Sequence, residues 1–510
     1  MRKIEKYHLY VIYGIFLIIT IPLACRINIW YDEAYTLNTT SKSIVYAYKQ
    51  AINFEMQPPV YFILLSIWRM VNETIIWARM LSILCILLSI FLINKLLINK
   101  IEFKFIPLLF FTINPITIWA ALEIRVYPLV ILTSIAYLYF FDKYYIKYYN
   151  KLIYRIINIF SILIGIYIYY FFSFLVLGVL IYLIIDKRKL LINYIVDLVI
   201  PTIGIIITLG WIFRHIEILY IEEKIPDFTI IDFIRYSVFH INDVYLISLS
   251  SIGIEGYFAF VFRIIFLSLL VIIVITNKQK LSFYIRNIYI IISIIIFICF
   301  AGVRYTLGEF YVLLPHSTII FIPLFMAFIS VLLVNKYRML IALFFMFLII
   351  INTISLFNEY KNIYKRFELK ALVNYINNVP NEKPVFFYTN DSYEVLSYYI
   401  NDKNIIPLPY EIDYSKFDYY NWIIKDTTKL DSIIIENLNS LNQDIFLYVT
   451  DNRKFLLNRT ANQDIVREYF INNYLLIDSF SIEPFSIYNL SKKNTRVDSY
   501  SKKSSSIFSN

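Results

Sequence analysis

Mostly apolar stretches of 15 to 25 residues recur from the N-terminus to about residue 357, and they limit the fold more than any other feature. A helix needs about 20 apolar residues to cross the ~30 Å hydrocarbon core of a bilayer. The apolar stretch Pro58–Val71 has only fourteen residues, so we expect a re-entrant or interfacial helix there. We expect eleven membrane-spanning helices, at 8–25, 79–94, 105–121, 126–141, 156–170, 171–185, 195–213, 257–276, 287–303, 310–334 and 339–357.

The composition excludes a water-soluble globule. Hydrophobic residues make up 59% of the 510 residues and charged residues 16%, against about 25% charged in an ordinary soluble domain. Nine glycines are too few for flexible linkers or glycine-rich phosphate loops. The three cysteines, Cys25, Cys85 and Cys299, lack the spacing of a disulfide scaffold or a Cys-ligated metal site, so we expect them to be core residues.

The basic residues follow a membrane topology. A net charge of +10 would suit a nucleic-acid partner, but eighteen lysines and arginines lie within the 54 residues of alternate short loops. Because Lys and Arg are enriched in cytoplasmic loops, we predict a multi-pass cell-membrane protein with its N-terminus inside and no nucleic-acid partner. With eleven spans, the chain after residue 357 lies outside. The predicted inner loops are 1–7, 95–104, 142–155, 186–194, 277–286 and 335–338.

The sequence changes character after Phe357. A helical segment, Arg366–Asn377, is followed by strand-like runs such as Val385–Tyr388 and Asp444–Val449. We therefore predict an α-helical polytopic membrane protein with a small C-terminal α/β domain. The predicted parts are a transmembrane catalytic region at 1–357, an extracytoplasmic α/β domain at 358–490 and a disordered tail at 491–510.

Two adjacent carboxylates, Asp32 and Glu33, directly follow the first predicted span, with Trp30 and Tyr31 before them. Near a membrane boundary, desolvation can raise the pKa of a carboxylate into the range that suits proton abstraction. The alternative is an interfacial loop with aromatic anchors and two solvated acids.

A second polar segment, Glu123 to Tyr127, joins the third and fourth predicted spans on the same predicted side. The guanidinium of Arg125 suits a bidentate grip on a phosphate at headgroup depth. A snorkelling arginine and a structural Glu123–Arg125 pair are the alternatives. Between the two segments, Gln57 precedes Pro58-Pro59, and it is either a lining residue of a polar pocket or part of a structural turn.

In this order, the motifs resemble the polytopic GT-C glycosyltransferases. The motifs are Asp32-Glu33, Gln57-Pro58-Pro59 where relatives commonly show His-Pro-Pro, and Glu123-x-Arg125-x-Tyr127. The family includes protein O-mannosyltransferases, the aminoarabinose transferases acting on lipid A, and bacterial family-39-like proteins. The resemblance covers about the first 140 residues by motif and the rest by architecture.

The resemblance implies transfer of a sugar from a polyprenyl-phosphate carrier to a lipid, glycan or protein acceptor on the outer face. By the family pattern, Asp32 would be the general base or would orient the acceptor, and Glu33 would support it. Arg125 would hold the donor phosphate, with Glu123 and Tyr127 shaping that site.

The sequence departs from the family pattern in two places. Gln57 stands where a histidine is common, which weakens a metal-assisted version of the reaction. Relatives often carry Arg-Tyr at the outer start of a late span ending in Leu-Pro, but this chain has Glu309-Phe310 there. Arg304 and Tyr305, five residues earlier, are the candidate substitutes.

No cofactor is required by the sequence, and a divalent metal is left open. The histidines show no His-x-x-x-His spacing, and we treat His215 and His240 as weak acceptor-site candidates. The alternative functions are a lipid or polysaccharide transporter or flippase, and an envelope polysaccharide polymerase or ligase. The paired broken helices and pseudo-symmetric halves of a transporter do not appear in the sequence. A polymerase or ligase would not require the acid pair directly after the first span.

Overall fold

The structure is a computed structural model of the whole chain, and it describes the residues at 2–97, 105–147, 151–220 and 287–307, parts of 318–354 and parts of 369–492. The chain divides into two compact units. The first contains Met1–Ile27 and Thr36–Ile363, and the second contains Asn28–Tyr35 and Tyr364–Asn510.

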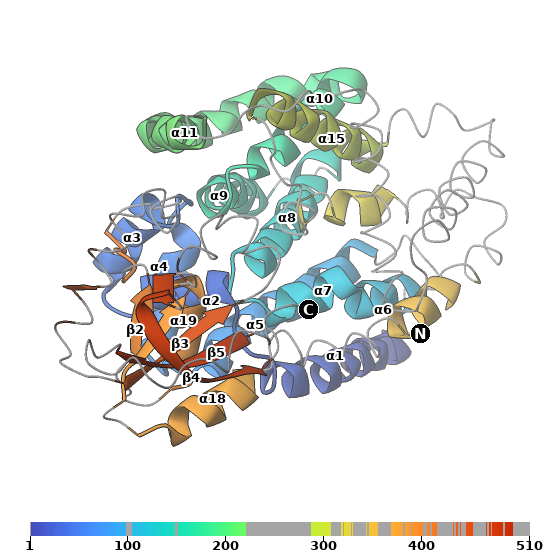
Figure 1. Cartoon of the computed structure of the whole chain (residues 1–510). Coiled ribbons are helices and arrows are strands. Elements are labelled where there is room, and N and C mark those ends of the chain that lie inside the picture. The colour runs from blue at the N-terminus through green and yellow to red at the C-terminus, as the bar shows by residue number, and fades with distance from the viewer. Residues whose placement is uncertain are drawn as a thin grey trace. The chain divides into compact units, whose positions relative to one another are not determined.

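The first unit is helical (Figure 1). Helix α2 (Tyr31–Thr39) begins in the second unit and ends in the first. The other elements of the first unit with continuous bounds are α1 (Arg2–Ala24), α3 (Ile44–Asn53), α4 (Val60–Arg69), α5 (Ile75–Leu97), α6 (Phe105–Ile113), α7 (Pro115–Leu122), α8 (Tyr127–Phe141), the π-helix η1 (Asp142–Ile146), α9 (Leu152–Ile168), α10 (Phe172–Asp186), α11 (Arg188–Tyr220) and α15 (Ile288–Leu307).

The eleven predicted spans are confirmed in part. Within the described residues, four helical stretches are long and apolar enough to cross a membrane, and the bent pair α6–α7 makes a possible fifth. The predicted spans at 156–170 and 171–185 coincide with α9 and α10, which are apolar helices of 10 to 17 residues, and the predicted span at 287–303 coincides with α15. The predicted span at 257–276 lies outside the described residues, as do parts of those at 310–334 and 339–357. The four long stretches are Tyr7–Ala24, Ile75–Leu97, Tyr127–Ile146 and Arg188–Thr208.

The predicted span at 105–121 is broken in the structure. Helices α6 and α7 meet at a 50° bend between Ile113 and Pro115. Asn114 caps α7, because its side chain accepts a hydrogen bond from the Ile116 N–H at 2.9 Å. Pro115 then occupies the first helical position, where its missing N–H costs nothing. These two residues start a new helix where hydropathy alone predicts a continuous one.

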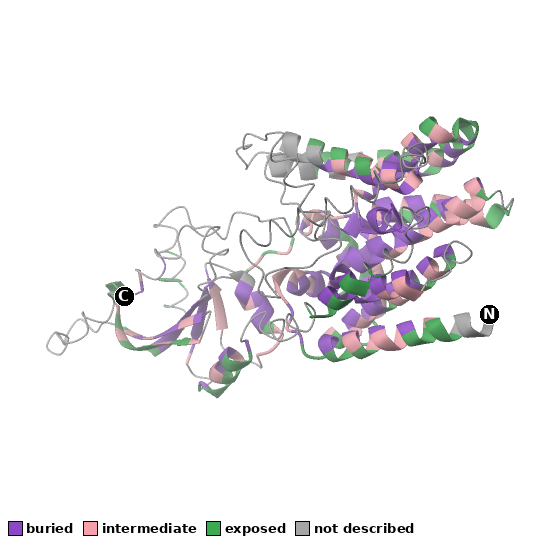
Figure 2. Ribbon diagram, turned by 90° about the vertical axis from the view of Figure 1, so that its right-hand side faces the viewer, coloured by how far each residue is buried: buried purple, intermediate pink, exposed green. Residues whose placement is uncertain are grey.

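Burial differs strongly among the candidate spans. Half of α5 is buried, whereas only 22% of the Arg188–Thr208 stretch of α11 is buried. Figure 2 colours the described residues by burial. Many exposed side chains of α1 and α11 are apolar, for example Ile18 at 75% and Ile207 at 73% exposure. Apolar side chains on the outside of a helical unit are typical of contact with lipid. Cys85 is buried but Cys25 is exposed, so the expectation of a core residue is wrong for Cys25.

The second unit contains a mixed five-stranded sheet in the order β2-β1-β3-β5-β4. Strand β1 runs parallel to β2 and β3, whereas β5 runs antiparallel to β3 and β4. The predicted strands at Val385–Tyr388 and Asp444–Val449 are confirmed as β1 and β3. The elements are α18 (Leu369–Asn378), β1 (Val385–Tyr388), α19 (Asn390–Ser397), β2 (Ile405–Leu408), β3 (Ile445–Asp451), β4 (Tyr474–Ile482) and β5 (Phe485–Lys492).

The sheet follows from its sequence. All four residues of β1 are buried, as expected for an apolar strand with a neighbour on each side. Pro407 lies in the edge strand β2, and proline, which has no N–H to donate, is tolerated in edge strands because they have a neighbouring strand on one side only. The hydrophobic core of the second unit is largely aromatic and includes Phe386, Phe446 and Tyr448 of the sheet. Strand β5 continues to Lys492, and residues 493–510 lie outside the described residues.

Candidate functional site

Arg125 lies in the buried turn between α7 and α8. Glu123 ends α7, and its carbonyl accepts a hydrogen bond from Ser82 Oγ of α5 at 2.6 Å. The Tyr127 ring at the start of α8 stacks on Trp119 with 4.8 Å between ring centroids. Every residue from Glu123 to Tyr127 is buried. The turn is therefore fixed from two sides, and it holds a guanidinium inside an apolar unit.

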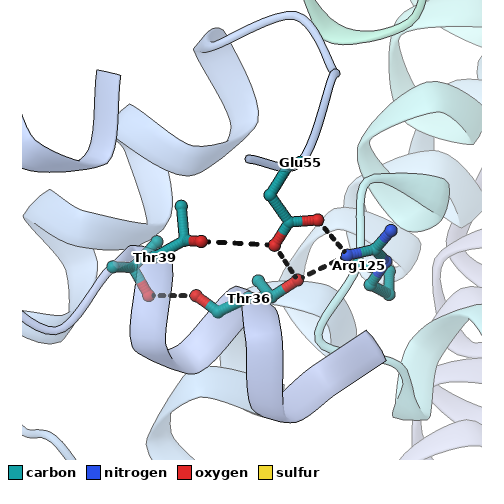
Figure 3. Close-up of polar contacts among 5 residues, drawn as sticks. Thr36, Thr39, Glu55 and Arg125 are labelled. Carbon is teal, nitrogen blue, oxygen red and sulfur yellow. Dashed lines mark hydrogen bonds and ion pairs between the residues drawn. The ribbon is translucent and has the colours of Figure 1, made fainter. Parts of the chain in front are cut away.

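The Arg125 guanidinium forms an ion pair with Glu55 (Figure 3). Nη1 donates to Glu55 Oε2 at 2.8 Å and to Thr36 Oγ1 at 2.7 Å. The side chains of Arg125 and Glu55 are only 7% and 5% exposed. Removing two charges from water is costly, and a close ion pair with added hydrogen bonds offsets that cost. This ion pair joins Arg125 to Glu55, seventy residues earlier in the chain.

The other carboxylate oxygen of Glu55 faces two threonine hydroxyls. Thr39 Oγ1 donates to Oε1 at 3.3 Å, and Thr36 Oγ1 donates to it at 3.5 Å (Figure 3). Thr36 and Thr39 come from the same turn of α2. The four residues form a polar cluster in which one cation faces one anion and two hydroxyls. Sequence analysis did not select Glu55, Thr36 or Thr39.

The chain reaches Glu55 through an unusual turn after α3. Glu55 N–H donates to Gln50 O at 3.0 Å, and Gln57 N–H donates to Ala51 O at 2.9 Å. Met56, between them, has a φ of 51°, the left-handed region that non-glycine residues seldom adopt. Strained backbone of this kind often occurs at functional sites. A lone carboxylate just before Gln57-Pro58-Pro59 is the sequence signal that could have identified Glu55.

Gln57 is half-buried in this turn, two residues before Pro59, which occupies the N-cap position of α4. Its Oε1 atom is buried and has no hydrogen-bond partner among the residues that the structure describes. A buried amide oxygen usually finds a donor. The geometry is compatible with a pocket-lining residue, and that role stays a prediction.

Asp32 and Glu33 form the first turn of α2, not a loop. Glu33 is fully buried, and its Oε2 accepts a hydrogen bond from the Trp30 N–H at 3.3 Å. This contact is one half of a capping box, in which a glutamate in the first turn bonds the N-cap amide. Asp32 is half-buried at the helix end, where the helix dipole favours a negative charge. The alternative of two solvated acids does not fit Glu33.

The first turn of α2, which carries Asp32 and Glu33 and is called the acid turn below, is held within the second unit. Ile29 N–H donates to the Tyr399 hydroxyl at 2.8 Å, and the Tyr398 hydroxyl donates to the Ala34 carbonyl at 3.4 Å. Tyr398 and Tyr399 directly follow α19. The acids therefore belong to the unit that carries the sheet, and Arg125 belongs to the helical unit. Convergence of Asp32 with Arg125 stays a prediction.

The remaining candidates are less defined. Arg304 and Tyr305 lie near the C-terminal end of α15, and their side chains lie outside the described residues. His240 also lies outside them, as does the side chain of His215. In the part of the chain that is described, no three His, Cys, Asp or Glu side chains gather at a spacing that could hold a metal ion.

Comparison with solved structures defines the class of fold. No family model matches the sequence, and no curated protein matches it. The fold nevertheless resembles that of ArnT, a protein of the GT-C class that the motifs predicted. The crystal structure of ArnT from Cupriavidus metallidurans in the apo state is similar with a TM-score of 0.56 and 11% identity, over 94% of this chain and 97% of that one.

A second crystal structure, of ArnT from Cupriavidus metallidurans bound to undecaprenyl phosphate, is similar with a TM-score of 0.50 and 12% identity. It covers 95% of this chain and 97% of that chain. ArnT is a lipid A aminoarabinose transferase. The fold is thus shared over nearly the whole length of both chains, although few residues are identical.

Proposed function

We propose that this protein is a membrane glycosyltransferase that moves a sugar from a polyprenyl-phosphate carrier to an acceptor hydroxyl on the outer face of the membrane. Asp32 is the base, Glu33 holds the turn that carries it, and Arg125 binds the donor phosphate. Glu123 and Tyr127 shape the Arg125 turn. The observation that carries the proposal is the buried Arg125 guanidinium in a chain whose fold is ArnT-like over 94% of its length.

The reaction follows from these roles. The acceptor oxygen forms a new bond to the anomeric carbon, and the bond from that carbon to the phosphate oxygen breaks. The acceptor proton passes to the Asp32 carboxylate, and a positioned base of this kind contributes about 10² to 10⁴ in rate. The polyprenyl phosphate leaves with the bonding electron pair, and the Arg125 cation stabilises its developing charge.

The ligand of the second ArnT structure supports the choice of donor. That protein binds undecaprenyl phosphate, so a fold of this kind accommodates an isoprenoid phosphate. An arginine can bind such a phosphate through two parallel N–H donors. In this chain Glu55 occupies the same guanidinium. We therefore propose that Glu55 is the counter-ion of Arg125 before the donor binds and that the donor phosphate competes with it.

Helix α2 supports a role for both charged groups in one reaction. Asp32 and Thr36 are four residues apart in it, and residues at this spacing lie on one face of a helix. Thr36 is the residue whose hydroxyl accepts a hydrogen bond from Arg125. Helix α2 thus carries both the proposed base and a hydrogen-bond partner of Arg125.

The test is incubation of the purified protein with labelled polyprenyl-phosphate sugars and candidate lipid, glycan and peptide acceptors. We expect labelled acceptor and free polyprenyl phosphate in equal amounts, and the Asp32→Asn variant should form both at least about 10²-fold more slowly. In sealed proteoliposomes, movement of intact donor across the bilayer without any labelled acceptor would instead indicate a transporter and contradict the proposal.

A further inference from the structure

Arg79 of α5 binds the chain just before the acid turn. Its Nη1 donates to the carbonyls of Ala24 at 3.0 Å and Ile27 at 2.6 Å. Ala24 is the last residue of α1, and Arg79 is only 1% exposed. The last carbonyls of a helix have no partner within the helix, and a cation there is favoured by the helix dipole. Arg79 therefore fixes where the chain leaves α1.

Arg69 of α4 binds the chain just after the acid turn. Its Nη1 donates to the Leu37 carbonyl and, at 2.7 Å, to Thr40 Oγ1. Thr40 Oγ1 in turn donates to the Thr36 carbonyl at 2.8 Å. Arg69 is 6% exposed and lies in the last turn of α4. It therefore fixes where α2 ends.

We propose that Arg69 and Arg79 are positioning residues for the acid pair, and this inference rests on the proposed function. Residues 28–35, between the two anchored ends, carry Asp32 and Glu33. A buried guanidinium costs more to desolvate than an apolar side chain of similar size. In return, the planar guanidinium of each arginine presents N–H donors in a rigid arrangement that fixes two acceptors at once.

The choice of arginine makes the inference specific. A lysine presents one rotating ammonium on a flexible stem, so it keeps the charge but loses the fixed fork. If Arg69 and Arg79 only stabilise the helical unit, the lysine variants should lower its stability without a specific effect on kcat. If the two arginines hold the acid turn in register, lysine should slow the chemical step. Donor binding should stay nearly unchanged, because both groups of the Arg125–Glu55 ion pair are retained.

The experiment compares Arg69→Lys and Arg79→Lys with Arg155→Lys. Arg155 is the matched control because its Nε donates to Asp197 at 2.8 Å, far along the chain from the acid turn. Sugar transfer gives kcat and the donor KM, and hydrogen exchange of the purified full chain reports on peptides within residues 24–40. For Arg69→Lys and Arg79→Lys, we expect kcat to fall at least about tenfold, a donor KM within about twofold of the original, and faster exchange in those peptides alone. Arg155→Lys should change none of these.

Two outcomes overturn the inference. One is an unchanged kcat with unchanged exchange at residues 24–40. The other is exchange that rises equally in α5 and α8, because that pattern indicates general destabilisation. A wild-type protein that transfers no sugar would end the proposed function instead. The exchange measurement then decides alone, since faster exchange confined to residues 24–40 supports the anchoring and unchanged exchange refutes it.

Discussion

Glu55 shows what single residues contribute and what sequence alone misses. The acid pair and Arg125 stand out in the sequence, since each is a charged group beside an apolar stretch. Glu55 does not, because its meaning comes from a contact with Arg125, seventy residues away in the chain. Glu33 was selected as a support for Asp32, and its contact with the Trp30 amide gives that support a physical form.

We predict that Glu55→Gln tightens binding of polyprenyl phosphate by about tenfold, or ~1.4 kcal/mol, because the phosphate no longer competes with a carboxylate. The same variant should lose about 3 kcal/mol of stability or more, because a buried guanidinium is left without its counter-ion. Equilibrium binding of labelled polyprenyl phosphate and thermal unfolding in detergent measure the two effects. Glu55→Asp keeps the charge and is the control. Weaker binding by Glu55→Gln would contradict competition between Glu55 and the phosphate for Arg125.

At the scale of elements, hydropathy predicted most helices but not their breaks. The predicted spans at 126–141 and 171–185 fall within one residue of α8 and α10. The span at 105–121 is bent because Asn114 and Pro115 begin a new helix, a signal that an average over apolar residues ignores. The turn after α3 could not be predicted, since Met56 gives no warning of a positive φ.

This turn gives a prediction about stability. Met56→Ile should destabilise the protein by about 1 to 2 kcal/mol, because a β-branched residue is poorly accommodated at a left-handed φ. Met56→Gly should be tolerated, because glycine adopts this φ without strain and its greater freedom in the unfolded chain costs only about 0.5 to 1 kcal/mol. Melting temperatures of the purified variants test the order. Equal melting temperatures for the two variants would show that the turn is not strained.

For the whole molecule, the sequence predicts membrane orientation from charge, and the structure confirms a set of apolar helices with a C-terminal sheet. The eighteen basic residues on one set of loops are a charge bias of the whole topology rather than a contact within the fold. The division into two units also has a feature that no local pattern predicts. Residues 28–35 leave the helical unit and group with the sheet more than 300 positions later.

We predict opposite accessibility for two exposed positions. In a chain with its three native cysteines replaced by serine or alanine, Ser415→Cys should react with a membrane-impermeant maleimide in intact cells, because it lies in the unit predicted outside. Lys189→Cys lies in the predicted inner loop at 186–194, and it should react only after the membrane is permeabilised. Labelling in the reverse order would show that the topology is inverted, with the acid turn on the wrong side of the membrane for an outer-face donor.

The split between rate and donor affinity in two variants tests the central claim most directly. Asp32→Asn should lower kcat by about 10² or more and keep the donor affinity, because only the base is lost. Arg125→Lys should weaken donor binding by about tenfold or more, because the bidentate fork is lost. Both proteins are assayed with the same labelled polyprenyl-phosphate sugar after equal membrane insertion is verified. Normal rate and normal affinity in both variants would contradict a shared role of this carboxylate and this guanidinium in sugar transfer.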